Sequence, residues 1–134
     1  MVEMELSKIV IDEKRHEQLI VLKEKNGQRS LPIVIGLAEA SAIKLKISGF
    51  NPQRPLTHDL LHTTIKYLEA NIEKIIIDRL EENTFYAKIV LKTSLGVERI
   101  IDARPSDSIA LAVRANAPIF VEDDIIKQTE TLSQ

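Results

Sequence analysis

Strand-like segments occur in two runs of three, and no helix-like segment separates the members of a run. The first run covers residues 4–12, 18–24 and 30–36, and the second covers residues 72–80, 85–92 and 97–103. Successive strands joined by short turns pair antiparallel, whereas a parallel doubly wound sheet needs a helix after each strand. The order therefore predicts an α+β fold. Its antiparallel or mixed sheets are built from two three-stranded meanders, each followed by helices.

Three local signals refine the strands. Asn26-Gly27 predicts a hairpin turn, because both residues tolerate a positive φ. Pro32 has no N–H group, so its strand is expected to lie at a sheet edge or to begin there. Three successive isoleucines at residues 75–77 suit a central strand that is covered on both faces.

Apolar spacing close to 3.6 residues predicts three helices. The first follows Gly36 and stops at Gly49, the second runs from Thr57 to Ala70, and the third covers about residues 106–115. Thr57 and Ser106 are predicted to be N-caps, because a hydroxyl can accept a hydrogen bond from a first-turn N–H group. A short strand is expected at residues 119–121.

Length and composition bound the class of protein. The 134 residues suit a single domain, with a core over about residues 4–121 and a polar C-terminal tail, residues 122–134, that is expected to fray. The absence of cysteine excludes disulfides, zinc–thiolate sites and thiol nucleophiles. No apolar run reaches the ~18–20 residues that span a bilayer, and no secretory leader is recognisable. A cytoplasmic protein without membrane contact is therefore expected.

The two halves share a weak similarity at an offset of 66 positions. Over this offset Ile35, Ile43, Leu45 and Pro52 match identical residues in the second half. Repeated supersecondary units produce such self-similarity, so an internal duplication is possible. It would put the strand-to-helix junction near Glu39 and the junction at residues 102–107 in equivalent places.

The segment Asp102-Ala-Arg-Pro-Ser-Asp107 lies between a strand and a helix. A structural interpretation explains part of it: Pro105 closes the strand, Ser106 caps the helix, and the positive end of the helix dipole stabilises Asp107. It leaves Asp102 and Arg104 unexplained, since they alternate at the end of the strand. Those two residues either pair with neighbouring groups or belong to a functional site.

Similar groups stand at two other helix starts. His58 follows Arg54 by four positions, and its ordinary pKa near ~6.5 suits proton transfer at neutral pH. Glu39 could join Asp102 and Asp107 around Mg²⁺ or Mn²⁺, ions that activate water against phosphodiesters. Arg54 and Arg104 could then hold phosphate oxygens.

Three motifs taken together, residues 31–43 (LPIVIGLAEASAI), 54–61 (RPLTHDLL) and 101–121 (IDARPSDSIALAVRANAPIFV), closely resemble the bifunctional nuclease domain family over about residues 10–121. Ser108 stands where that family usually has alanine. The resemblance implies an α+β fold and nuclease activity on DNA and RNA. The motif positions in this chain are Glu39, Arg54, His58, Asp59, Asp102, Arg104, Ser106, Asp107 and Arg114.

The sequence thus predicts a divalent-metal-dependent nuclease that cleaves DNA and RNA with low sequence specificity. Asp102, Asp107 and His58 are the expected catalytic residues. Arg54, Arg104 and Arg114 are expected to bind substrate, and Glu39, Asp102 and Asp107 to bind the metal. The alternative is a non-enzymatic ligand-binding or assembly module, and exposed meander edges favour a homo-oligomer in either case. The net charge of −2 counts against strong nucleic-acid binding, which normally needs a basic surface.

Overall fold

The computed structural model describes residues 1–12 and 14–132. The elements follow in the order β1 (Val2–Asp12), β2 (Glu17–Glu24), β3 (Ser30–Ile35), α1 (Leu37–Ile47), α2 (Thr57–Tyr67), β4 (Ala70–Glu81), β5 (Thr84–Thr93), β6 (Glu98–Ala103), α3 (Pro105–Ala115), β7 (Ile119–Val121) and α4 (Asp123–Leu132). The predicted α+β class and both meander-then-helix units are confirmed. The proposed internal duplication stays a prediction, although each half has the order of three strands and then a helix that it requires.

The strands form one mixed sheet in the order β3-β2-β1-β7-β4-β5-β6. The short strand β7 joins the two meanders: Ile119 pairs antiparallel with Met4 of β1 and parallel with Ile75 of β4. The edge position predicted from Pro32 is confirmed, because β3 ends the sheet on one side. β6 ends it on the other side.

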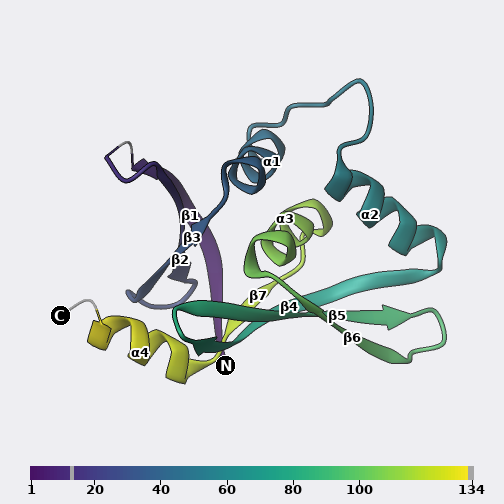
Figure 1. The fold of residues 1–134 in the computed structure, drawn as a ribbon. Coiled ribbons are helices and arrows are strands. Elements are labelled where there is room, and N and C mark those ends of the chain that lie inside the picture. Colours follow the sequence, from purple (N-terminus) through teal and green to yellow (C-terminus); the bar gives the residue numbers. More distant parts are fainter. Residues whose placement is uncertain (13, 133–134) are drawn as a thin grey trace.

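The helices pack unequally on this sheet (Figure 1). The first meander stands across the second, and α3 lies in the angle between them with α1 and α2 on the same side, whereas α4 lies apart near the N-terminus. α3 is buried along most of its length, and Ile109 and Leu111 are fully inside the core. Burying one such side chain contributes roughly 1.5–3 kcal/mol, and α3 packs against α1 of the first half and against β4 and β5 of the second.

Strand β4 differs from the expectation drawn from its three isoleucines. Ile75 and Ile77 are fully buried, but Ile76 between them is half-buried. Side chains alternate between the faces of a strand, and α2 and α3 contact β4 from the same face. β4 is therefore internal in strand order but is not covered on both faces.

The C-terminal tail does not fray over residues 123–132. These residues form α4, whose Ile125 and Ile126 are buried in the core, and Arg29 holds Asp123 at 2.9 Å. The two buried isoleucines and the Arg29–Asp123 ion pair anchor this helix. The core therefore extends beyond residue 121. Residues 133 and 134 lie outside the described part of the chain.

Two predicted caps are wrong. The N-cap of α2 is Leu56, one residue before Thr57, and its N–H group donates to Asp59 Oδ2 at 2.9 Å. The N-cap of α3 is Arg104, with Pro105 at the first helical position, so Ser106 lies inside the first turn. Helix α2 also ends at Tyr67 rather than Ala70, because Glu69 adopts a φ of 62° and Ala70 already belongs to β4.

Candidate functional site

The junction between β6 and α3 orients a group of charged side chains. Pro105 fixes the backbone at the first position of α3 and removes an N–H group that would have no helical partner. The N–H and the hydroxyl of Ser108 both donate to the Arg104 carbonyl at 3.0 Å, which fixes the first turn. Asp107 consequently projects from a rigid helix start.

Asp107 is hydrogen bonded through both carboxylate oxygens. His58 Nε2, at the start of α2, lies 2.9 Å from Oδ1, and Arg104 Nε donates to Oδ2 at 3.0 Å. Arg104 also donates from Nη2 to Glu39 Oε1 at 3.3 Å, in the first turn of α1. We call Glu39, His58, Arg104 and Asp107 the Asp107 cluster. Four residues expected at a site from sequence thus converge from three helix starts.

Gly36 lies in close contact with the side chain of Glu39 at the start of α1. A Cβ atom at Gly36 would overlap the carboxylate of Glu39, which folds back over the N-cap position. The carboxylate of Glu39 thus lies against the backbone of Gly36, and from there it accepts the hydrogen bond from Arg104. The two strand-to-helix junctions, one in each half of the chain, meet at this ion pair.

The charge state of the cluster follows from its contacts. Burial alone would raise the pKa of Asp107, but the hydrogen bonds from His58 and Arg104 outweigh it and hold that pKa below its ordinary value. The hydrogen bond to Asp107 raises the pKa of Arg104. An ionised carboxylate only accepts, so His58 carries a proton on Nε2, and in the neutral ring Nδ1 is the free base.

Asp102 lies outside the Asp107 cluster. Its side chain is 76% exposed and receives a hydrogen bond from Lys88 Nζ at 3.1 Å, directly across the β5–β6 pair. The neighbours of Lys88, Ala87 and Ile89, point into the core. Because side chains alternate along a strand, Lys88 and Asp102 point to the sheet face opposite α3. The expected convergence of Asp102 with Asp107 is not observed.

Arg114 holds helices together. Its side chain is 3% exposed, and Nε donates to Asp59 Oδ1 at 2.7 Å. The guanidinium also donates to the carbonyl of Ala110 at 2.8 Å and to that of Ala42 at 3.4 Å. These bonds tie α3 to α2 and α1, and they leave Arg114 poorly placed for the predicted substrate contact.

The carboxylate that pairs with Arg114 is also ionised. Burial would raise the pKa of Asp59, but the bonds from Arg114 and from the Leu56 N–H group lower it. The ionised pair satisfies both groups at a helix interface, where an unpaired charge would be costly. Asp59 therefore ties α2 to α3 through Arg114.

Arg54 is exposed in the loop before α2. It lines a pocket of about 460 Å³ together with Asp59, Phe50 and one edge of Arg114, and not with the Asp107 cluster. Arg54 and Arg104 therefore serve different surfaces, although both were expected to hold the same phosphate.

The expected metal ligands do not form a cage. Among residues 1–12 and 14–132, no group of three or more His, Asp or Glu side chains is placed to hold a metal ion. Glu39 and Asp107 are bridged by the Arg104 guanidinium, which stands where a cation between them would sit. Mg²⁺ usually keeps several water ligands and binds through one or two carboxylates and substrate phosphates, so an ion at this place would depend on the substrate for part of its coordination.

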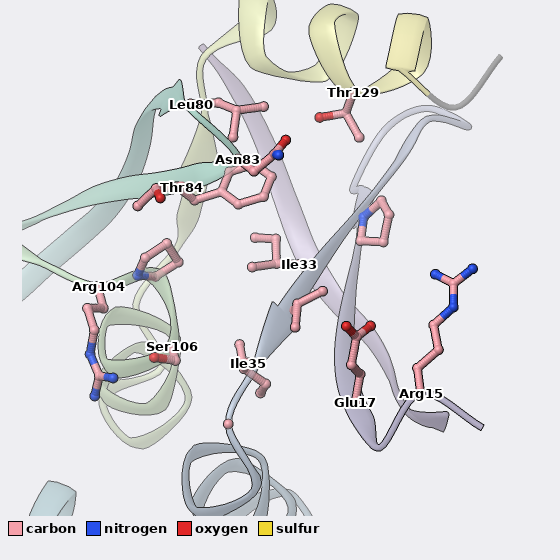
Figure 2. A pocket seen from close by; sticks show the side chains of 15 residues that line it. Arg15, Glu17, Ile33, Ile35, Leu80, Asn83, Thr84, Arg104, Ser106 and Thr129 are labelled. Carbon is pink, nitrogen blue, oxygen red and sulfur yellow. The ribbon is translucent and has the colours of Figure 1, made fainter. Parts of the chain in front are cut away.

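A pocket of about 940 Å³ lies beside the cluster, between β3, the β4–β5 turn and the start of α3 (Figure 2). Arg104 and Ser106 line it at the helix start, and Ile33 and Ile35 line it from β3. Sequence reasoning missed this pocket. Its residues come from five separate segments, and only Arg104 and Ser106 carried a polar signal in a recognisable motif.

The fold and these contacts define an α+β domain with a charged cluster at helix starts, next to an open pocket. The chain belongs to the bifunctional nuclease domain family, whose model matches residues 20–134. It is 40% identical over 124 residues to uncharacterized proteins from two strains of Mycobacterium tuberculosis, which covers 92% of this chain and 73% of each relative. None of the helices in the described part of the chain is long and apolar enough to cross a membrane.

Proposed function

We propose that this chain is a nuclease that hydrolyses phosphodiester bonds of DNA and RNA with low sequence specificity. Membership of the bifunctional nuclease domain family supports nuclease activity in general. The observation that carries the proposal is the His58–Asp107–Arg104 arrangement, in which a carboxylate orients a histidine beside an arginine whose side chain is 66% exposed. The geometry supplies a proton-transfer group and an anion-binding group at one place.

His58 is the proposed proton carrier. Asp107 holds the Nε2–H tautomer and stabilises the imidazolium that forms when Nδ1 takes a proton, as in carboxylate–histidine pairs generally. No other hydrogen bond engages this ring within the described part of the chain. Nδ1 takes a proton from the attacking water, the water oxygen bonds to phosphorus, and the bond from phosphorus to the leaving sugar oxygen breaks. The imidazolium then returns the proton to that oxygen.

Arg104 is the proposed phosphate ligand. A guanidinium has five N–H donors, and its bonds to Asp107 and Glu39 use two of them, which leaves three for phosphate oxygens. Contacts to phosphate read no base identity, which agrees with low sequence specificity. The carboxylates on either side hold the planar group in place and reduce the entropy lost on binding.

No metal-dependent step is proposed, because the described side chains do not form an ion cage. The dependence on Mg²⁺ or Mn²⁺ expected from the sequence stays a prediction. It is tested by comparing cleavage in Mg²⁺, in Mn²⁺ and in excess chelator. Full activity in chelator would exclude a dissociable metal, and activity only with added ion would require ligands from the substrate itself.

The test is cleavage of end-labelled single- and double-stranded DNA and of RNA by highly purified protein. We expect cleavage of all three by wild type and a loss of at least about 10²-fold in His58→Ala, the usual size of a general-base contribution. Thr64→Ala, an exposed substitution two turns along α2 from His58, is the control and should cleave normally. Equal cleavage by wild type and His58→Ala would point to a contaminant and end the proposal.

The alternative is a non-enzymatic ligand-binding or assembly module. In that case the Asp107 cluster has a structural role: the bond of His58 joins α2 to α3, and the bond of Glu39 joins α1 to α3. Stabilisation of the wild-type protein by a nucleotide, with no cleavage of any substrate, would favour this alternative. The cytoplasmic location and the homo-oligomeric state stay predictions, whether the protein is a nuclease or a non-enzymatic module.

A further inference from the structure

The pocket beside the Asp107 cluster has two chemically different ends (Figure 2). One end is polar and is formed where α1 and α3 begin, at Gly36, Arg104 and Ser106. The other lies below the β4–β5 turn and is lined by Leu80, Asn83, Thr84 and Phe85. Ile33 and Ile35 of β3 line the space between them. A volume of about 940 Å³ is sufficient for a ligand of nucleotide size or larger.

The polar end favours an anion. Gly36 is the N-cap of α1 and Arg104 is the N-cap of α3, so two helix N-termini border the same pocket. Glycine has no side chain and a guanidinium only donates, so neither N-cap residue has a side-chain acceptor for its own first turn. The N–H groups and the dipoles of such helix starts attract phosphate and carboxylate groups.

Ser106 supplies an independent indication of a ligand. The residue is 6% exposed and lines the pocket, and within residues 1–12 and 14–132 its hydroxyl makes no hydrogen bond. By contrast, Ser108 in the same turn is buried and donates to the Arg104 carbonyl. Within the described residues, Asp78 Oδ1 is the only fully enclosed side-chain polar atom without a partner, so the Ser106 oxygen is not fully enclosed and a ligand in the pocket can reach it. The spare donors of Arg104 border the same end.

The other end suits a flat or apolar body. Leu80, Phe85 and the two isoleucines of β3 offer apolar surface, and an aromatic ring can stack on a nucleobase. Asn83 and Thr84 at the turn supply an amide and a hydroxyl for the polar edge of such a ring system. Phosphate at one end and base at the other match the order of groups in a nucleotide.

We propose that this pocket binds a nucleoside monophosphate or the phosphorylated terminal nucleotide of a strand. The phosphate lies against Ser106 and Arg104 at the start of α3, and the base lies against Phe85. This site adjoins the proposed hydrolysis site and shares Arg104 with it, but His58 does not line the pocket. The free nucleotide and the strand end share one recognition chemistry, and short oligonucleotides with and without a 5′-phosphate distinguish them.

Isothermal titration of the full chain with adenosine 5′-monophosphate tests the proposal, with adenosine and inorganic phosphate as partial ligands. We expect saturable binding of the monophosphate and at least about tenfold weaker binding of each part, since each meets only one end. Ser106→Ala should weaken binding about tenfold through loss of one bond to a charged group. Ser48→Ala, which removes an exposed hydroxyl at the far end of α1, is the matched control and should bind as wild type does.

A second variant keeps the test independent of helix stability. Thr84→Trp places a large ring at the pocket from an exposed strand position and should abolish binding while the circular dichroism spectrum stays unchanged. Absence of saturable binding at millimolar monophosphate, or wild-type affinity in either Ser106→Ala or Thr84→Trp, would overturn the proposal. His58→Ala separates the two claims, since it should remove cleavage and leave nucleotide affinity within about twofold.

Discussion

His58 Nε2 and Asp107 Oδ1 lie 2.9 Å apart although the residues are 49 positions apart in the chain. The first is at the start of α2 and the second at the start of α3, so the bond depends on how two helices pack on the second meander. Asp107 also binds Arg104, which reaches α1 through Glu39. One carboxylate thereby fixes the geometry of every group in the proposed site.

The acid sensitivity of the fold should depend on Asp107. Its pKa is lower in the folded chain than in the unfolded one, so folding is favoured by the ionised form. This stabilisation is fully present above the ordinary aspartate pKa of about 3.9 and is lost as the pH falls through the lowered value. Thermal melts from pH 7 to pH 2 should show Asp107→Asn less stable near neutrality, with the difference shrinking in acid. A constant difference at every pH would contradict this assignment.

Arg114 should matter to stability rather than to substrate binding. Arg114→Leu removes the partner of Asp59 inside a helix interface and should destabilise the fold by about 3 kcal/mol. The exposed Arg54→Ala should change stability by less than about 0.5 kcal/mol. Urea unfolding followed by circular dichroism measures both. If Arg114→Leu is as stable as wild type, the three-helix role of Arg114 is wrong.

The function of Arg104 should depend on the planar guanidinium group, which can donate several hydrogen bonds at once. Arg104→Lys keeps the charge but cannot bind Asp107, Glu39 and a phosphate at the same time. We expect kcat/KM for DNA to fall by at least about tenfold, the effect of losing one charge-assisted bond. Steady-state kinetics on a labelled oligonucleotide measure it. Unchanged kinetics in Arg104→Lys would mean that Arg104 contributes only charge.

The predicted self-association is best placed at β6. This strand forms one sheet edge, none of its six residues is buried, and Ile100 is 60% exposed. An exposed apolar edge is a pairing surface for a second copy. Light scattering should give a mass above 15.1 kDa for wild type and 15.1 kDa for Ile100→Lys. Val34→Lys on the other edge, where the side chain is 57% exposed, is the control that should stay associated, and a monomeric wild type would refute the prediction.

Local sequence signals predicted the elements well and their contacts only in part. Runs of strands gave the α+β class, and acidic residues at helix starts marked the first turns that hold Glu39, Asp59 and Asp107. The pairing of each acid with a particular arginine depends on how the helices pack. The local spacing of residues in the sequence does not determine that packing. Asp59 and Asp107 occupy the same kind of position, yet one pairs with Arg114 and the other with Arg104.

The position of Asp102 shows a second limit. Asp102 is close to Asp107 in sequence, and this closeness suggested a shared site. However, the pairing register decides which side of the sheet a strand residue faces. The register that sets Asp102 opposite Lys88 turns it away from α3. The C-terminal helix shows a third limit, because the burial of Ile125 and Ile126 depends on the tertiary surface that receives them.

Cleavage by Asp107→Asn and Asp102→Asn, measured side by side on the same labelled single-stranded DNA and RNA, tests the central claim most directly. Both variants remove one carboxylate charge from a segment of six residues, and only Asp107 contacts His58 and Arg104. We predict that Asp107→Asn loses at least about 10²-fold in rate, as expected when a histidine loses its orienting carboxylate, and that Asp102→Asn retains wild-type cleavage. Equal rates in wild type and Asp107→Asn, or loss of cleavage in Asp102→Asn alone, would contradict a site centred on Asp107.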